Sequence, residues 1–204
     1  MHPRVYREFE KICTEHPIRG SVLEVGATAT DDCLLEMKPL QQASERIGLD
    51  FTGPIEQNGY KILKGNANAM DCFEDNRFDA VLCSSVLEHD KYFWKTLSEI
   101  KRVTKPGGMV VIGVPGYSKL RAEKVKGLWA RMPLVRRLQV NEYLNMFFTS
   151  TITFQVHNWP GDFYRFSPQA MREVFLEGME NIEVRTIMWP PRVIGIGIKP
   201  MAGA

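Results

Sequence analysis

The fold of this chain is decided by the stretch Ser21-Val22-Leu23-Glu24-Val25-Gly26-Ala27-Thr28-Ala29-Thr30. Three apolar residues within four positions, ended by Gly26, are typical of a short buried strand in a mostly parallel sheet. A glycine directly after a strand lets the backbone approach a ligand closely, because no Cβ stands in the way. Ligands of open α/β sheets bind at the carboxyl ends of the strands, so the later segments should bring further ligand-facing residues to this edge.

The composition predicts one globular domain over residues 1–204. Hydrophobic residues make up 44% and charged residues 25%, and the net charge of +2 does not by itself indicate a nucleic-acid partner. The apolar runs are too short to span a bilayer, and the chain opens on a charged amphipathic segment instead of a signal peptide. The four cysteines (Cys13, Cys33, Cys72 and Cys83) have no C-x-x-C spacing. We therefore expect a cytoplasmic protein with reduced thiols and no metal site.

Strand and helix patterns alternate along the chain. Val5, Phe9 and Ile12 lie on one helical face, so residues 1–18 are expected to form an N-terminal helix that covers the sheet edge or the ligand cleft. Further strands are expected at 46–51, 60–65, 78–84, 109–114, 182–187 and 192–198, helices at 31–39, 91–105 and 167–178, and a loop at 52–59. A short connection makes the last two strands antiparallel. The order predicts an α/β fold of about seven strands with helices on both faces.

Five short motifs occur in order between residues 20 and 116. They are Leu23-Glu24-Val25-Gly26, Gly48-Leu49-Asp50, Gly65-Asn66-Ala67, Phe78-Asp79-Ala80-Val81 with Leu87-Glu88-His89, and the run from Leu97 to Gly108. Each alone is a weak signal, but in this order and spacing the chain resembles a class I S-adenosylmethionine-dependent methyltransferase of the small type 11 kind. The resemblance implies a Rossmann-like, mostly parallel sheet with a terminal antiparallel hairpin. It also implies methyl transfer from S-adenosylmethionine to O or N of a small-molecule or carrier-bound acceptor.

The resemblance places the cofactor at the carboxyl ends of the first four strands. Asp50 would accept hydrogen bonds from both ribose hydroxyls, because an ionised carboxylate is a strong bidentate acceptor. Gly26 would approach the methionine part, and Glu24 would orient the cofactor's ammonium or, equally, bind a local backbone amide. Asn66 would accept from the adenine amino group. The expected cofactor-binding residues are Glu24, Gly26, Ala27, Asp50, Asn66, Ala67, Met70, Cys83 and Ser84, with a core position as the alternative for Met70 and a small buried residue as our interpretation of Cys83.

The turn after Gly26 departs from the family pattern, because Ala27-Thr28-Ala29-Thr30 contains no second glycine. Alanine and threonine can still approach a ligand if their φ angles are negative. If the turn needs further positive φ angles, a non-catalytic protein of the same fold with a binding or regulatory role is the alternative. A nicotinamide-dependent oxidoreductase is a second alternative, which the missing G-x-G-x-x-G motif disfavours.

The acceptor side is expected in the segment 157–168. His157 is the best candidate for a general base, since the reference pKa of histidine lies near neutrality, and Tyr164 is the second catalytic candidate. Trp159, Arg165 and His89 are the candidate substrate-binding residues. The alternative is structural: Asp162 and Arg165 would brace the segment against the sheet. Methyl transfer from an activated sulfonium can also proceed by positioning alone, without a base.

Residues 117–160 break the alternation and are expected to form a lid or substrate-binding insertion after the fifth strand. Within it, residues 118–137 carry seven basic side chains: Lys119, Arg121, Lys124, Lys126, Arg131, Arg136 and Arg137. This stretch suits an anionic or carrier-bound acceptor or peripheral contact with a membrane, but we favour a solvated basic face on a helix. Nucleic-acid binding is poorly supported, because the positive charge is local and no RNA-binding motif occurs.

Overall fold

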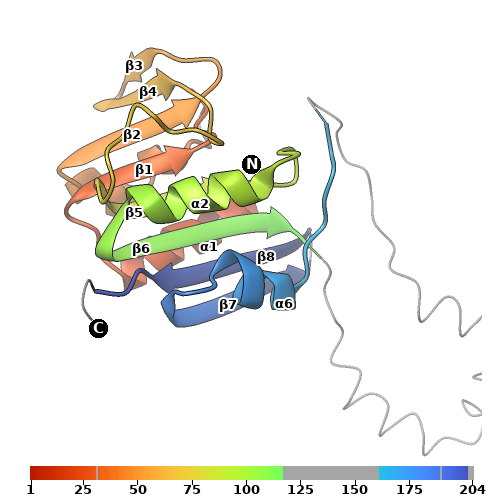
Figure 1. Cartoon of the computed structure of the whole chain (residues 1–204). Coiled ribbons are helices and arrows are strands. Elements are labelled where there is room, and N and C mark those ends of the chain that lie inside the picture. Colours follow the sequence, from red (N-terminus) through yellow and green to blue (C-terminus); the bar gives the residue numbers. More distant parts are fainter. Residues whose placement is uncertain (31, 117–160, 189, 202–204) are drawn as a thin grey trace, which may run out of the picture.

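The computed structural model describes residues 1–30, 32–116, 161–188 and 190–201 (Figure 1). These residues form one eight-stranded sheet in the order β3-β4-β2-β1-β5-β6-β8-β7. The strands are β1 (Ser21–Val25), β2 (Glu45–Asp50), β3 (Ile55–Gln57), β4 (Tyr60–Lys64), β5 (Phe78–Ser84), β6 (Thr104–Pro115), β7 (Glu180–Met188) and β8 (Pro191–Ile198). The predicted mostly parallel α/β sheet with a terminal antiparallel hairpin is therefore confirmed.

Five neighbouring strands of the sheet run parallel. They are β4, β2, β1, β5 and β6, and β8 then runs antiparallel to both β6 and β7. Strand order reverses at β1, since β2 lies on one side of it and β5 on the other. The turn after Val25 therefore lies at the switch point where open α/β sheets bind their ligands.

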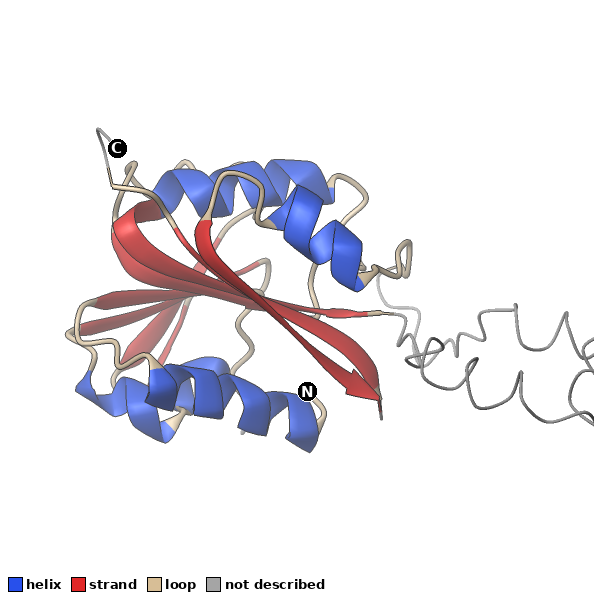
Figure 2. Cartoon of the chain, turned by 90° about the horizontal axis from the view of Figure 1, so that it is seen from below, coloured by secondary structure: helices blue, strands red, loops and turns tan. Residues whose placement is uncertain are grey.

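Helical segments cover both faces of the sheet, as Figure 2 shows. One face packs against α1 (Pro3–Glu15) and the short 3₁₀ segments η1 (Leu34–Glu36) and η2 (Lys38–Gln42). The other face packs against α2 (Phe93–Val103) and η3 (Met171–Phe175), which follows the single turn α6 (Pro168–Ala170). Burial on both faces explains why β1 and β5 are almost continuously apolar.

The N-terminal helix follows its predicted pattern. Val5, Phe9 and Ile12 are buried with at most 1% exposure, and α1 covers the middle of one face, where its cluster includes β5, β6 and β8 residues. A Cβ on Gly113 of β6 would lie 2.8 Å from the Phe9 ring, so the glycine allows the helix to pack closely there. The start of α1 lies at the carboxyl end of β5, where Ser84 Oγ is 3.8 Å from the sulfur of Met1.

Two local predictions were wrong. Residues 52–59 were expected to be a loop, but they contain β3, which pairs with β4 through a turn at Asn58 and Gly59, both with positive φ. An Asn-Gly pair is a strong signal for this kind of hairpin turn. Residues 31–39 were expected to form one helix, but they form η1 and the beginning of η2, since Pro39 blocks a continuous α-helix.

Other element boundaries shifted. The helix expected at 91–105 ends at Val103, and β6 begins directly at Thr104. The helix expected at 167–178 is a single α-turn at 168–170 that widens into the π-helical segment η3, ending at Phe175. Ser167 caps it as expected, accepting a hydrogen bond of 3.0 Å from the Ala170 amide. The predicted lid, residues 117–160, lies outside the described residues.

Candidate functional site

The turn after β1 needs only one residue with positive φ. Gly26 has a φ of +79°, whereas none of Ala27, Thr28, Ala29 and Thr30 is among the described residues with positive φ. A Cβ on Gly26 would lie 2.2 Å from Cγ2 of Val86, and the Gly26 amide donates to Leu49 O at 2.8 Å. The absence of further glycines therefore places no conformational obstacle in this turn.

The buried carboxylate of Glu24 makes local contacts. Its Oε2 accepts hydrogen bonds of 3.2 Å from the Leu35 amide and from the Cys33 thiol. Burial raises the pKa of Glu24 to about 7. Of the two roles considered for Glu24, these contacts match the local backbone one, because they hold the chain after the turn against β1.

Asp50 lies at the carboxyl end of β2 with one oxygen used locally. Its Oδ1 accepts from the amide of Thr52 at 2.9 Å and from the Thr52 hydroxyl at 2.6 Å. Its other oxygen makes no hydrogen bond to any residue that the structure describes. Next to it, Phe51 is 68% exposed. A half-exposed carboxylate beside an exposed aromatic ring suits a ligand that carries both a diol and a flat ring.

The residues after β4 divide into exposed and buried ones. Asn66 is exposed, and its side-chain oxygen accepts from the Asn68 amide at 2.9 Å, while Ala67 is half-buried. Met70 is fully buried in the core. Its amide donates to Glu99 and its carbonyl accepts from Arg102. The Met70 side chain therefore packs inside the protein, which matches the core position considered as the alternative to cofactor binding.

At the end of β5, the predicted residues are also mostly buried. Cys83 is 1% exposed, and burial raises the pKa of its thiol well above its usual range. Ser84 is 8% exposed. Ser85 has a φ of 57°, which is rare for a residue with a side chain, and its amide donates to Gly113 O. Such strain recurs at functional sites, and here it lies at the carboxyl edge of the sheet.

Three features of this sheet edge could contact an adenosyl cofactor. The edge offers a tight glycine turn at Gly26 packed directly against Val86, an available carboxylate oxygen on Asp50 and an exposed ring on Phe51. The three features come from β1 and from the end of β2, which are paired in register with Val25 opposite Leu49. The chain's residues therefore fit such a group at this edge.

The segment 161–166 lies across the carboxyl ends of β5 and β6 (Figure 1). The Phe163 amide donates to Glu88 O at 2.8 Å, and the Phe166 amide donates to Pro115 O at 3.1 Å. Tyr164 donates its hydroxyl to Lys91 O at 3.0 Å, and its ring centre is 5.1 Å from that of Phe93. The segment is therefore bound to the sheet edge by backbone and side chains.

The side chains of Arg165 and His89 both bind residues of this segment. Arg165 forms a two-pronged ion pair with Asp162, and His89 Nδ1 is hydrogen-bonded to Gly161 O. The Asp162–Arg165 pair is the bracing contact of the structural alternative. The candidates His157 and Trp159, together with the basic residues 118–137, lie outside the described residues.

Glu88 entered the sequence analysis only as part of a motif, but the structure gives its side chain an unusual setting. The residue is 2% exposed, and its buried Oε2 has no hydrogen-bond partner among the described residues. Burial raises the pKa of Glu88 to about 7. Phe51 and Ser85 were also missed. An aromatic residue directly after Asp50 was a usable signal for the first, whereas nothing in the sequence indicates the φ of Ser85.

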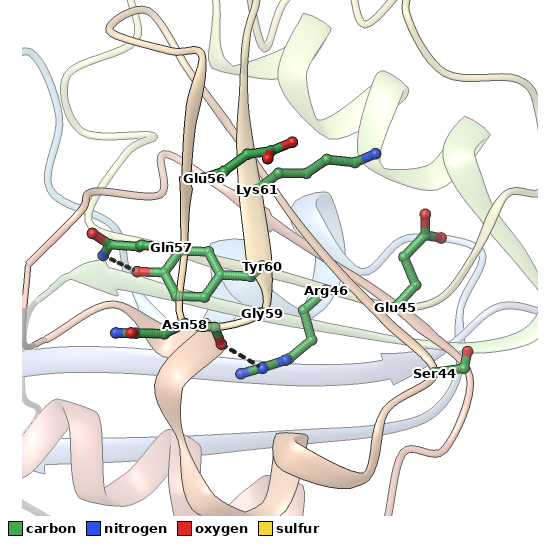
Figure 3. A pocket seen from close by; sticks show the side chains of 9 residues that line it. All are labelled: Ser44, Glu45, Arg46, Glu56, Gln57, Asn58, Gly59, Tyr60 and Lys61. Atoms are coloured by element: carbon green, nitrogen blue, oxygen red, sulfur yellow. Dashed lines mark hydrogen bonds between the residues drawn. The ribbon is translucent and has the colours of Figure 1, made fainter.

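A separate hollow of about 510 Å³ lies at the opposite edge of the sheet (Figure 3). Its lining comes from the start of β2 and from the β3–β4 hairpin, and includes Arg46, Asn58 and Tyr60. Arg46 donates to Asn58 O at 2.8 Å and to Leu35 O at 2.7 Å, so its guanidinium serves the hairpin. None of the predicted site residues lines this hollow.

Comparison with known proteins supports the resemblance found in the motifs. Residues 34–112 match the family profile described as "Methyltransferase domain". A demethylmenaquinone methyltransferase of Shouchella clausii is 25% identical over 243 aligned positions, which cover 97% of this chain and 97% of that protein. The chain carries a class I methyltransferase domain. It is an S-adenosylmethionine-dependent methyltransferase, as the motifs predicted, and S-adenosylmethionine is its cofactor.

Solved structures share the fold of this methyltransferase. The 1,6-didemethyltoxoflavin-N1-methyltransferase of Burkholderia thailandensis, solved with S-adenosylhomocysteine, superposes with a TM-score of 0.63 at 14% identity, covering 96% of this chain and 78% of that one. A Haloferax volcanii methyltransferase solved with the activator Trm112 has a TM-score of 0.60 at 14% identity, covering 98% and 94%.

Two features are absent from the described residues. No helix there is both long enough and apolar enough to cross a membrane. The same part of the chain contains no group of three or more His, Cys, Asp or Glu side chains placed to hold a metal ion.

Proposed function

We propose that the methyltransferase transfers a methyl group from S-adenosylmethionine to O or N of a small-molecule or carrier-bound acceptor. One observation carries the proposal. The cofactor-side features at Gly26 and Asp50 and the segment 161–166 occupy the same carboxyl edge of the sheet. A methyl donor on one half of this edge would lie beside an acceptor on the other half, and such proximity supplies much of the rate enhancement of a displacement reaction.

On the cofactor side, this chain's residues would bind and orient S-adenosylmethionine. The available oxygen of Asp50 would accept from the ribose hydroxyls, and Phe51 would cover the adenine ring. The backbone at Gly26 would approach the methionine part, with Ala67 and Asn66 near the edge of the adenine. When bound, S-adenosylmethionine supplies a methyl group already activated on a sulfonium sulfur.

On the acceptor side, Tyr164, Arg165 and His89 would shape the site. Their side chains are held by Lys91, Asp162 and Gly161. They would therefore position an acceptor rigidly instead of moving with it. His157 as general base and Trp159 as a substrate contact stay predictions. The names of the full-length relatives make demethylmenaquinone one acceptor to test.

The first experiment is thermal unfolding of the protein with S-adenosylmethionine, S-adenosylhomocysteine, NAD⁺ or NADP⁺. At about 100 times Kd, a ligand stabilises by roughly 2.7 kcal/mol, which raises the Tm of a domain this size by about 5–11 °C. We expect this shift with the two adenosyl sulfur compounds alone. A shift with the dinucleotides would favour an oxidoreductase, and no shift with any ligand would favour a non-catalytic protein.

Asp50→Asn tests the ribose contact. The variant keeps an oxygen for Thr52 but loses the charge, so we expect S-adenosylhomocysteine to bind about 10- to 100-fold more weakly, because hydrogen bonds to charged groups contribute about 1.5–3 kcal/mol. Calorimetric titration measures the Kd. The control is Asp71→Asn, the same change at an exposed position. An unchanged Kd in Asp50→Asn would remove Asp50 from the ribose role.

The acceptor class is tested by transfer of labelled methyl groups. The panel contains phenols, alcohols, amines and demethylmenaquinone, each incubated with the protein and labelled S-adenosylmethionine. Product carrying label on O or N supports the proposal. Label only on carbon would correct the acceptor atom, and binding of S-adenosylhomocysteine without any transfer would favour the non-catalytic alternative.

A further inference from the structure

Two charged side chains at the acceptor half of the edge, the buried Glu88 and the half-buried Arg192, each have a buried atom without a hydrogen-bond partner among the described residues. Glu88 follows β5, and its buried Oε2 makes no hydrogen bond to any residue that the structure describes. Arg192 is the second residue of β8 and lies opposite Pro115, the last residue of β6; its buried Nε likewise has no partner in the described part of the chain. One atom is a hydrogen-bond acceptor and the other a donor. Leaving the hydrogen bond of either atom unmade costs about 1–3 kcal/mol or more. We therefore expect a third polar group to bind both atoms.

The two side chains do not satisfy each other. No nitrogen–oxygen distance between them is 4.0 Å or less, yet each lies in the electrostatic field of the other. Near Glu88, Arg165 and Asp162 pair with each other, His89 Nε2 is 3.9 Å from Glu88 Oε1, and the buried Cys83 thiol lies in the electrostatic field of Glu88. None of these reaches Oε2. A small group that both donates and accepts would complete the site.

We propose that Glu88 and Arg192 bind the hydroxyl group of the acceptor, and that Glu88 takes its proton during methyl transfer. This inference rests on the proposed function and narrows it to O-methylation. A hydroxyl can donate to Glu88 Oε2 and accept from Arg192 Nε while keeping a second lone pair for attack. A neutral amine that accepts from Arg192 has no lone pair left, and an ammonium group has none at all.

The reaction balances with this assignment. The acceptor oxygen forms a bond to the methyl carbon as its O–H bond breaks, and the proton passes to Glu88 Oε2. The electron pair of the broken S–C bond stays on the sulfur of S-adenosylhomocysteine. A carboxylate with a pKa near 7 is well matched to this task at neutral pH, since the best general base has a pKa near the working pH.

The surroundings favour an aromatic hydroxyl. Phe163 and Tyr164 donate their backbone amides to Glu88 O, and the Phe163 side chain is 53% exposed. An exposed ring on a residue whose backbone is bound to Glu88 can stack on an aromatic acceptor while the acceptor's hydroxyl reaches inward. The substrate class is therefore a phenol or a related aromatic hydroxyl compound.

The test measures binding of catechol by ligand-detected NMR titration, with and without S-adenosylhomocysteine. We expect saturable binding that strengthens as the pH rises through about 7, because the carboxylate form of Glu88 accepts the hydroxyl. Glu88→Gln and Arg192→Gln should each weaken it about 10- to 100-fold. Glu88→Asp keeps the charge and should keep the pH dependence. The matched control Glu173→Gln, an exposed position on η3, should bind as the wild type does.

Two results would overturn the assignment and leave only a buried water as the third group: no saturable binding of catechol, or equal affinity in Glu88→Gln. Transfer of labelled methyl to benzene-1,2-diamine as fast as to catechol would overturn the restriction to O-methylation. Thermal unfolding shows whether the variants are folded, and their Tm shift with S-adenosylhomocysteine shows whether the cofactor side is intact. A wild-type protein that binds catechol but not S-adenosylhomocysteine would refute the proposed function and not this site.

Discussion

At the scale of single residues, a side chain at Gly26 would be unfavourable for two separate reasons. Its φ of +79° would strain any L side chain, and a Cβ there would also meet Val86 at 2.2 Å. The sequence showed a turn with one glycine, but not whether one was enough. That depends on the φ angles of the next four residues, which follow from how the chain passes beneath β2 and not from residue type alone.

Gly26→Ala should destabilise the protein by about 3 kcal/mol, of which about 1–2 kcal/mol is the cost of left-handed backbone and the rest the displacement of Val86. Urea denaturation measures the change. Gly178→Ala is the matched control, because Gly178 has a φ of +76° but a Cβ there would meet nothing within 4 Å. Equal losses in the two variants would show that Val86 moves freely and that no close approach exists at Gly26.

The candidate site shows which residues a motif can predict. Asp50 and Gly26 could be placed at the sheet edge because their positions at strand ends follow from apolar runs that are easy to recognise. Glu88 was visible as part of a motif, but its proximity to Arg192, far along the chain, was not. Patterns within one segment carry no information about such long-range neighbours.

At the scale of elements, strands were easier to predict than helices. The strands of the parallel core had buried, nearly continuous apolar sequences, and all of those expected are present. The missed strand β3 is three residues long and half-exposed, so its apolar pattern is weak. The pair Asn58-Gly59 nevertheless indicated the hairpin turn. The expected helix at 31–39 failed because its apolar residues pack in two separate 3₁₀ turns.

One element-scale contact holds the loop after β4 to α2. Arg102 donates to Met70 O and Phe73 O, and also pairs with Glu99 and Asp75. It therefore satisfies carbonyls of the loop that follows Asn66 and Ala67. The loop has its own apolar anchor in Met70, but its backbone relies on this arginine.

Arg102→Met should destabilise the protein by about 2–3 kcal/mol, because two carbonyls and two carboxylates lose a charged donor while the apolar stem is kept. Hydrogen exchange should also show faster exchange in residues 66–75 than in the wild type. Lys95→Met, on the same helix, is the control and should stay within about 0.5 kcal/mol. If Arg102→Met matched that control, the network would be an exposed one of little energetic weight.

At the scale of the whole molecule, two buried carboxylates should shape the dependence of stability on pH. Burial raises the pKa values of Glu24 and Glu88 to about 7 from the usual value of 4.5. Between these values the folded state binds more protons than the unfolded state, so the free energy of unfolding should fall as the pH rises from about 5 to 8. Each carboxyl group can lower the free energy of unfolding over this pH range by on the order of 3 kcal/mol at most.

Acid should destabilise the protein through other groups. Asp79 and Glu99, whose pKa values are lowered by Lys105 with Ser21 and by Arg102, contribute stability that is lost as the pH falls below about 4.5. Maximum stability is therefore expected near pH 5. Urea denaturation from pH 4 to 8 measures the slope, which should flatten in Glu24→Gln and in Glu88→Gln. An unchanged slope in both variants would show that these carboxyls ionise normally.

The antiparallel β8 has a consequence for the order in which the protein can mature during synthesis. The cofactor half of the edge is built from β1, β2 and the end of β5, which leave the ribosome together and early. Arg192 reaches the other half only because β8 reverses direction and brings its amino-terminal end beside the end of β6. A nascent chain can therefore form the proposed donor half of the edge well before it can form the proposed acceptor half, so on this proposal the ability to bind the donor precedes the ability to use it.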